Sequence, residues 1–292
     1  MFTGKLYIGL KGHSHWIKDI YPLQNGGFIT GSTDNTAKIW DSETGENKVT
    51  LKKHLSSIKA VCELKNNSIV TSSEDMTIII WNIDKALHFK VNSEIYCVRP
   101  LLDNLVYGDE DGNIVVCNNI GEEIFMLKGH TRRISCLLQN DILISGSHDR
   151  TIKLWDNGQC IRTLEGHTHF VNSICQMQDV LASGSHDTLI KLWDIRTGKC
   201  IKDIQSYLTH LYSPKEDKYI KIKDIKDYNH VSSLCCLDNG KLLSNSNETI
   251  RMWDIRNEKY ELEIFDQGNE MCKLIDNKVA VGKWDGSIKI LK

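Results

Sequence analysis

One thirteen-residue stretch recurs almost unchanged and constrains the fold more than any other feature of the chain. It reads ISGSHDRTIKLWD from Ile144 to Asp156, and it returns within LASGSHDTLIKLWD from Leu181 to Asp194. Thirty-eight residues separate Trp155 from Trp193, and a Gly-His pair precedes each copy. Self-similarity at a fixed period of this size is typical of repeat architectures, in which each repeat forms one supersecondary unit.

Seven positions divide the chain into units of this kind. The markers that end the units are Trp40, Trp81, Cys117, Trp155, Trp193, Trp253 and Leu291. An acidic or amide residue stands six positions before each marker: Asp34, Asp75, Asp111, Asp149, Asp187, Asn247 and Asp285. Asp and Asn bond to their own backbone and tolerate turn dihedral angles, so they predict tight turns between antiparallel strands. The segment after each turn alternates like a half-buried strand.

The Gly-His start, the Asp-bearing turn and the Trp-Asp end resemble the WD-repeat β-propeller family. The strand wording is closest to F-box/WD-type propellers, but without an F-box. This resemblance covers essentially the whole chain and implies an all-β, seven-bladed β-propeller of four-stranded antiparallel blades. The last unit stops before its outer strand, whereas residues 5–10 precede the first unit by one strand. We therefore expect the N-terminal strand to join the last blade and close the ring, which leaves no open sheet edge.

The period is interrupted once, where sixty residues separate Trp193 from Trp253. This step predicts an insertion at about residues 205–229 in what we expect to be a single domain of residues 1–292. Basic and acidic residues nearly balance at 36 and 38, which disfavours nucleic-acid binding through phosphate neutralisation.

The cysteines and the apolar segments indicate the compartment. The ten cysteines lack C-x-x-C spacing, so they indicate small buried side chains in a reducing compartment and no zinc site. The chain has no signal-peptide pattern and no run of eighteen apolar residues. We expect an intracellular protein of the cytoplasm or the nucleus.

The family resemblance also implies a hydrogen-bonded set of four side chains in several blades: the His of Gly-His, a Ser or Thr, the turn Asp and the marker Trp. The matching sets are His13, Thr30, Asp34 and Trp40; His54, Thr71, Asp75 and Trp81; His130, Ser145, Asp149 and Trp155; and His167, Ser183, Asp187 and Trp193. One active site does not need four such sets, so they predict a scaffold device and no catalytic residue. Cys117, Asn247 and Leu291 interrupt the pattern in the other three units.

The resemblance further places three residues of each unit on one face around the channel: the third and fifth after the His, and the one before the turn Asp. From these positions we expect partner binding by Trp16, Lys18, Glu74, Glu94, Tyr96, Glu110, Arg133, His148, Phe170, His186 and Trp284. In the seventh unit, which lacks Gly-His and is aligned by distance, the rule also selects Glu270 and Cys272. Large aromatic side chains and arginine are the usual anchors of protein interfaces.

These features favour a noncatalytic scaffold that binds a partner protein or peptide at the channel face. One alternative is the substrate-recognition subunit of a ubiquitin-ligase assembly that acts through separate subunits. Another is a propeller enzyme, a hydrolase or lyase, which is disfavoured because the face holds no convergent acid/base or metal constellation. We expect no cofactor, no metal and no nucleic-acid or membrane partner, and a chain that is monomeric by itself or part of a complex.

Overall fold

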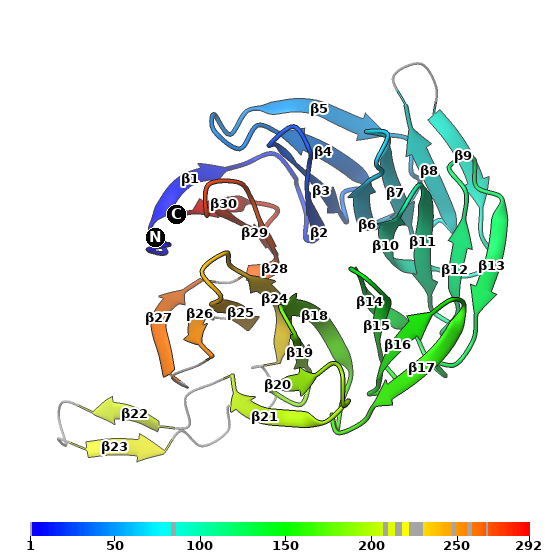
Figure 1. Cartoon of the computed structure of the whole chain (residues 1–292). Helices are drawn as coiled ribbons and strands as arrows, with labels where there is room; N and C mark the ends of the chain where they lie inside the picture. Colours follow the sequence, from blue (N-terminus) through cyan, green and yellow to red (C-terminus); the bar gives the residue numbers. More distant parts are fainter. Residues whose placement is uncertain are drawn as a thin grey trace.

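The strands form seven four-stranded antiparallel sheets arranged around a central axis (Figure 1). The computed structural model describes residues 2–82, 86–206, 210–213, 218–221, 230–246, 249–255, 259–266 and 268–292. No helix in these ranges is long and apolar enough to cross a membrane. The seven four-stranded sheets confirm the predicted seven-bladed propeller.

Each blade is a simple meander, numbered here in chain order. Blade 1 contains β2 (Ile17–Pro22), β3 (Phe28–Ser32), β4 (Thr36–Trp40) and β5 (Asn47–Lys52). Blade 2 contains β6 (Ile58–Glu63), β7 (Ile69–Ser73), β8 (Thr77–Trp81) and β9 (Ala86–Lys90). Blade 3 contains β10 (Ile95–Leu101), β11 (Asn104–Asp109), β12 (Ile114–Cys117) and β13 (Glu123–Leu127). Blade 4 contains β14 (Ile134–Gln139), β15 (Leu143–Ser147), β16 (Ile152–Asp156) and β17 (Gln159–Leu164).

The remaining blades follow the same order. Blade 5 contains β18 (Val171–Met177), β19 (Val180–Ser185), β20 (Leu189–Asp194) and β21 (Cys200–Gln205). Blade 6 contains β24 (Val231–Cys236), β25 (Leu242–Ser246), β26 (Thr249–Asp254) and β27 (Lys259–Phe265). Blade 7 contains β28 (Gly268–Lys273), β29 (Val279–Lys283), β30 (Ile288–Leu291) and the N-terminal strand β1 (Leu6–Leu10).

The ring closes where the predicted N-terminal strand joins the last blade. β1 pairs antiparallel with β30, and Gly9 lies opposite Lys289 in the ladder. The backbone N–H groups of Thr3 and Lys5 donate to the carbonyl of Lys292 at 3.1 and 3.2 Å. Both chain ends therefore lie side by side in this blade (Figure 1).

The apolar core is divided among the spaces between adjacent blades. The second strand of blade 4, β15, is buried along its whole length, because neighbouring blades cover both faces. One core cluster joins Ile144 and Ile152 of blade 4 to Val171 and Trp193 of blade 5. The outer strands lie on the rim, and four of the five residues of β13 are exposed. Stability thus depends on contacts between blades as well as on the ladders within them.

All ten cysteines are free thiols, and their burial largely follows the apolar strands that carry them. Six are buried and two are half-buried, whereas Cys160 and Cys200 are exposed on outer strands. Free cysteines usually behave as small apolar side chains when buried.

A hairpin interrupts the blades in the region where the sequence predicted an insertion. β22 (His210–Ser213) pairs with β23 (Lys218–Lys221) and with no blade strand. Figure 1 places this hairpin beyond the rim, near β21 and β27. The rest of the predicted insertion from residue 207 onward, and the turn residue Asn247, lie outside the described residues.

Candidate functional site

A β-bulge in each innermost strand shapes one face of the ring. The ladder between β2 and β3 passes from the pair Ile17–Ser32 directly to Asp19–Gly31, so no residue of β3 lies opposite Lys18. The same irregularity leaves Lys59 out of the ladder of β6 and Tyr96 out of that of β10. A bulge re-aims the side chain of its extra residue. This explains why these three side chains line the mouth of the channel.

Backbone hydrogen bonds hold the other two predicted face positions side by side. These are the residue just before the innermost strand and the residue before the turn Asp. The N–H of Glu110 donates to the carbonyl of Glu94 at 3.0 Å, and the N–H of His148 donates to that of Arg133 at 2.9 Å. The N–H of His186 donates in the same way to Phe170 at 3.0 Å. Residues that are about fifteen positions apart in one blade are thereby presented together on the face.

A pair of contacting tryptophan side chains, the tryptophan pair, lies where blades 7 and 1 meet. The rings of Trp16 and Trp284 are in edge contact, with centroids 4.5 Å apart, and 45% of Trp16 is exposed. The Nζ of Lys18 lies 4.8 Å from the Trp16 ring centroid and 5.8 Å from that of Trp284. Burial, and then the charge of Lys59, lower the pKa of Lys18. The tryptophan pair and Lys18 combine an accessible apolar surface with one partly desolvated cation.

Alternating charges surround Tyr96 in the next sector of the face. Arg133 lies over the Tyr96 ring, with Cζ 3.7 Å from the centroid, and forms an ion pair with Glu110. The Nζ of Lys59 lies 5.2 Å from the Tyr96 ring centroid, and Lys59 forms an ion pair with Glu74. The Tyr96 hydroxyl donates to Glu94, and burial together with this hydrogen bond raises the pKa of Tyr96.

A stack of imidazoles and one phenyl ring completes the face over blades 4 to 6. The ring of His148 stacks on Phe170 at 4.0 Å, and that of His186 stacks on His230 at 4.0 Å. His169 bridges these pairs, with its centroid 4.2 Å from Phe170 and 5.3 Å from His186. Burial, followed by neighbouring positive charge, lowers the pKa of His148 and of His186 to about 4, so both are neutral at pH 7. His169 was missed from the sequence, although it adjoins Phe170.

The described part of the chain contains no group of three or more His, Cys, Asp or Glu side chains that could hold a metal ion. The predicted face residues lie in three sectors: the tryptophan pair, the charged sector around Tyr96 and the histidine stack.

The alignment of the seventh unit by distance was wrong by three residues. Gly268 pairs with Lys283 as Ile17 pairs with Ser32, so Asn269 occupies the position of Lys18. Its Nδ2 donates to the carbonyl of Ile17 at 2.7 Å. Glu270 lines the channel interior instead, and Cys272 is buried in the core between blades 7 and 1. The seventh unit has no Gly-His pair, and counting residues along the chain did not show that β28 starts at Gly268.

Four blades contain a continuous chain of hydrogen bonds from tryptophan to aspartate. In blade 1, Trp40 Nε1 donates to Thr30 Oγ1 at 2.9 Å, and His13 lies between Thr30 at 2.7 Å and Asp34 at 2.8 Å. Because the carboxylate only accepts, His13 Nδ1 donates to it, and Nε2 is the ring atom that faces the Thr30 hydroxyl. Burial acts to raise the pKa of Asp34, but hydrogen bonds from His13 and Thr36 outweigh it and lower the pKa.

The same connections recur in blades 2, 4 and 5. The His–Asp distances are 3.0 Å for His54–Asp75, 2.7 Å for His130–Asp149 and 2.7 Å for His167–Asp187. The corresponding hydroxyl groups belong to Thr71, Ser145 and Ser183, and they accept from Trp81, Trp155 and Trp193. Blade 6 has part of this arrangement, since Trp253 Nε1 donates to Ser244 Oγ at 2.7 Å.

Charged residues inside the channel were not anticipated from the sequence. Asp19 accepts the Val61 N–H at 2.8 Å and lies 3.4 Å from Nη1 of Arg99. Glu270 also lines this channel, and its Oε2 has no hydrogen-bond partner among the described residues. Burial, and then the nearby charge of Asp19, raise the pKa of Glu270 to about 8. A charged residue in the middle of an apolar strand was the available signal, as in the sequence CVRPL around Arg99.

Comparison with known proteins identifies the repeat. The sequence profile described as "WD domain, G-beta repeat" matches residues 4–41, 45–82, 121–156, 158–194 and 216–254, more than half of the chain. The crystal structure of the WD40 propeller domain of Doa1 superposes with a TM-score of 0.81 over 100% of this chain and 98% of that one, at 19% identity. At this identity the likeness concerns the fold alone.

Curated relatives match shorter segments. Nuclear distribution protein PAC1 of Coccidioides posadasii is 36% identical over 180 residues, which are 59% of this chain and 35% of that protein. PAC1-1 of Uncinocarpus reesii is 41% identical over 91 residues, 27% of this chain and 20% of its own length. The tRNA (guanine-N(7)-)-methyltransferase non-catalytic subunit wdr4 of Dictyostelium discoideum is 36% identical over 102 residues, 31% of this chain and 22% of that protein. The chain thus spans about a fifth to a third of these relatives.

Proposed function

The chain belongs to the WD40 repeat family, and from this premise we propose that it is a noncatalytic scaffold that binds a partner protein or peptide at the channel face. The observation that carries the proposal is the contact between Trp16 and Trp284, because a large aromatic pair at a partly exposed site suits an interface anchor. The charged sector around Tyr96 and the histidine stack extend this surface around the mouth.

The three sectors supply different kinds of contact. In the charged sector, Lys59 and Arg133 are paired with Glu74 and Glu110, so a partner that supplies both an acidic and a basic side chain can bind there with every charge paired. The histidine stack offers the faces and edges of its rings, and those of His148 and His186 are neutral at pH 7. Interfaces are typically built from aromatic anchors surrounded by such polar contacts.

A catalytic use of the Ser/His/Asp sets is disfavoured by access. The hydroxyl-bearing residues Thr30, Thr71, Ser145 and Ser183 are each 0% exposed, so a substrate could not approach them. Their oxygens accept from tryptophan, and each histidine is held between hydroxyl and carboxylate. One relative is by name a non-catalytic subunit, which agrees with a scaffold.

We also propose that residues 1–292 act as one domain, in the cytoplasm or the nucleus, within a larger assembly. The closed ring of sheets and the ten free cysteines support this proposal. A substrate-recognition role in a ubiquitin-ligase assembly would use the same channel face, and copurification of ligase subunits would identify it.

The proposal is tested by replacing Trp16 and Trp284 with alanine together. Proteins captured by wild type and by the double variant are quantified by mass spectrometry, and the affinity for any partner so identified is then measured with purified proteins. We expect each tryptophan to contribute about 1–4 kcal/mol to binding, with little change in the melting temperature.

The control is the double variant Ile161→Ala and Ile201→Ala, which removes exposed apolar side chains from the outer strands of blades 4 and 5. It should retain the partner. Equal binding by the tryptophan variant and wild type would refute the assignment of this face, and so would unfolding of the tryptophan variant, because the two rings would then be core residues.

A further inference from the structure

The turn at the far end of β10 carries an unusual leucine. Glu94 precedes β10 on the proposed binding face, whereas Leu102 follows the strand and therefore lies on the opposite face. Leu102 has a φ of 55° and is 77% exposed. Blade 5 has the same two-residue turn, with the polar Gln178 at this position, also at positive φ. A bulky apolar residue is unfavourable in this conformation and is costly to expose, so its presence suggests a binding function.

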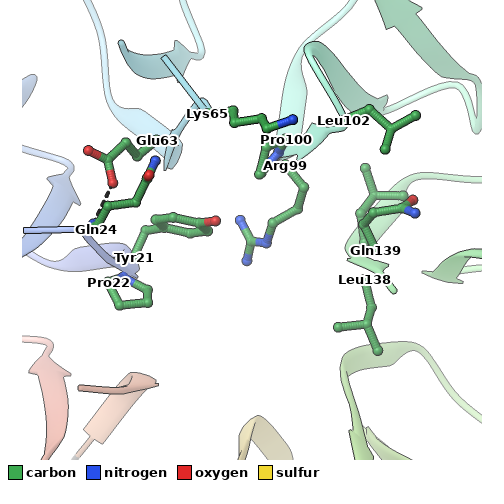
Figure 2. Close-up of a pocket in the computed structure, with 11 residues that line it drawn as sticks. Tyr21, Pro22, Gln24, Glu63, Lys65, Arg99, Pro100, Leu102, Leu138 and Gln139 are labelled. Carbon is green, nitrogen blue, oxygen red and sulfur yellow. Dashed lines mark hydrogen bonds between the residues drawn. The ribbon is translucent and has the colours of Figure 1, made fainter. Parts of the chain in front are cut away.

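Leu102 lies at the edge of a cavity of about 460 Å³ (Figure 2). The cavity has apolar walls formed by Pro22, Pro100 and Leu138, together with the ring of Tyr21. Arg99 lines both this cavity and the channel, so its side chain forms part of the partition between them. A cavity of this size is suited to a small ligand or to the end of a chain.

The Arg99 guanidinium has hydrogen-bonding capacity to spare. Figure 2 shows it pointing into the space between Tyr21 and Leu138. Its Nη1 donates to the carbonyl of Val98 at 2.7 Å and more distantly to Asp19 at 3.4 Å. Among the residues with described positions, none accepts from Nε or Nη2. These two groups form one edge of the planar fork, which is the geometry that binds a carboxylate through two parallel hydrogen bonds.

The charges around the cavity favour an anion. Lys65 and Arg99 are the cations of the lining, and Glu63 is its single carboxylate. Glu63 already accepts the N–H of Gln24 at 2.7 Å, which is the dashed contact in Figure 2. The Nζ of Lys65 lies 3.4 Å from Asp103, but both side chains are largely exposed and so weakly held.

We propose that this cavity binds the C-terminal carboxylate of a partner polypeptide whose last residues are aliphatic. The terminal carboxylate would accept from Nε and Nη2 of Arg99, and the last side chain would pack against Leu102, Pro100 and Leu138. The partition formed with Arg99 favours a chain end, because a continuing chain would have to turn back. This site is independent of the tryptophan pair and lies on the opposite face.

A second cavity extends the surface in the direction from which the partner chain would arrive. It has a volume of about 660 Å³, shares Leu102 and Gln139 with the first, and continues to Phe125, Met126 and Ile142. Phe125 and Met126 are 40% and 37% exposed on β13. Apolar residues that precede the terminus can therefore pack there without a rearrangement of the backbone.

The probes for the test are N-acetyl-leucyl-leucine with a free carboxylate and the same compound with a C-terminal amide. Binding to the full chain is followed by NMR of labelled leucine methyl groups. We expect the acid to shift the Leu102 and Leu138 signals and to bind about tenfold or more tightly than the amide, since a charge-assisted pair is lost in the amide. Arg99→Gln should abolish this preference.

Because Arg99 also contacts the buried Asp19, Arg99→Gln could disturb folding, and Leu102→Gln gives an independent test. This change copies blade 5, so it should preserve the melting temperature and weaken binding of the acid by about fivefold or more. Leu55→Gln is the matched control, because Leu55 is 88% exposed and follows His54, at the start of blade 2 on the opposite face.

Three results would each overturn the proposal: equal binding of acid and amide, no binding of the acid up to its solubility limit, or wild-type affinity in folded Leu102→Gln. A further arm uses 4-methylpentanoate, which has the carboxylate and aliphatic group of leucine but no peptide bond. If it binds as tightly as the dipeptide acid, the site takes a small aliphatic acid and the docking of a chain end is refuted.

Discussion

Replacement of His167 by alanine tests how the repeated hydrogen-bond chains stabilise the blades. His167 is 6% exposed, and its Nδ1 donates to Asp187 at 2.7 Å. Its Nε2 lies 2.7 Å from Ser183 Oγ, which also accepts from Trp193 Nε1 at 2.8 Å. The substitution removes the middle of this chain and leaves a cavity the size of an imidazole ring.

The structure limits the loss to a moderate value. Asp187 keeps the N–H groups of Thr168 at 2.9 Å and Leu189 at 3.0 Å, so its carboxylate does not become an unpaired buried charge. Ser183 likewise keeps Trp193. The remaining loss is one charge-assisted hydrogen bond plus packing, for which we expect the free energy of unfolding to fall by about 1–3 kcal/mol. For a chain of 292 residues, that corresponds to a melting temperature lower by roughly 2–5 °C.

Urea and thermal unfolding of purified His167→Ala provide the measurement, and His88→Ala is the control because His88 is exposed on the outer strand β9. The single variants and the double variant with Asp187→Asn form a double-mutant cycle, in which we expect a positive coupling energy. A folded His167→Ala protein that unfolds together with the His88→Ala control, or a cycle without coupling, would refute the stabilising role of the set.

The remaining predictions concern pH and ring closure. Although burial acts to raise them, hydrogen bonds lower the pKa values of Asp34, Asp75, Asp149 and Asp187 in the folded state. Their stabilisation is therefore present above the unfolded pKa of about 4 and is lost as pH falls through the folded pKa, so the melting temperature should drop steeply below about pH 4. Glu270 has the opposite sign, because burial raises its folded pKa to about 8. Urea unfolding of Glu270→Gln should show a stability advantage over wild type that grows between about pH 4.5 and 8, and a pH-independent difference would contradict the burial of this carboxylate. Deletion of residues 2–10 removes β1 and opens the edge of β30, so we expect a lower melting temperature and self-association in gel filtration. A monomer with unchanged melting temperature would show that ring closure contributes little.

Local chemistry allowed much of the architecture to be predicted. Asp149 and Asp187 mark turns because their side chains bond to nearby backbone N–H groups, an interaction that depends on a few consecutive residues. The alternating strand after each turn and the extra strand at residues 5–10 then required a closed ring. Closure placed Trp16 beside Trp284 although they are at opposite ends of the chain, and their ring centroids lie 4.5 Å apart.

Positions without a local signal were decided by the tertiary structure. Where a Gly-His pair exists, counting from it locates the residue at the bulge. Blade 7 has no such pair, so Glu270 was placed on the face, although it lines the channel. Repeat spacing could not reveal that His186 stacks on His230 across the interrupted period, or that Arg99 approaches Asp19 from two blades away. The sequence by itself determined the strands, the turns and the number of blades, because these depend on neighbouring residues and a periodic pattern. Only the tertiary structure decided which side chains meet across the channel and in the cavity lined by Arg99 and Leu102, because those contacts depend on how the blades are oriented when the ring closes.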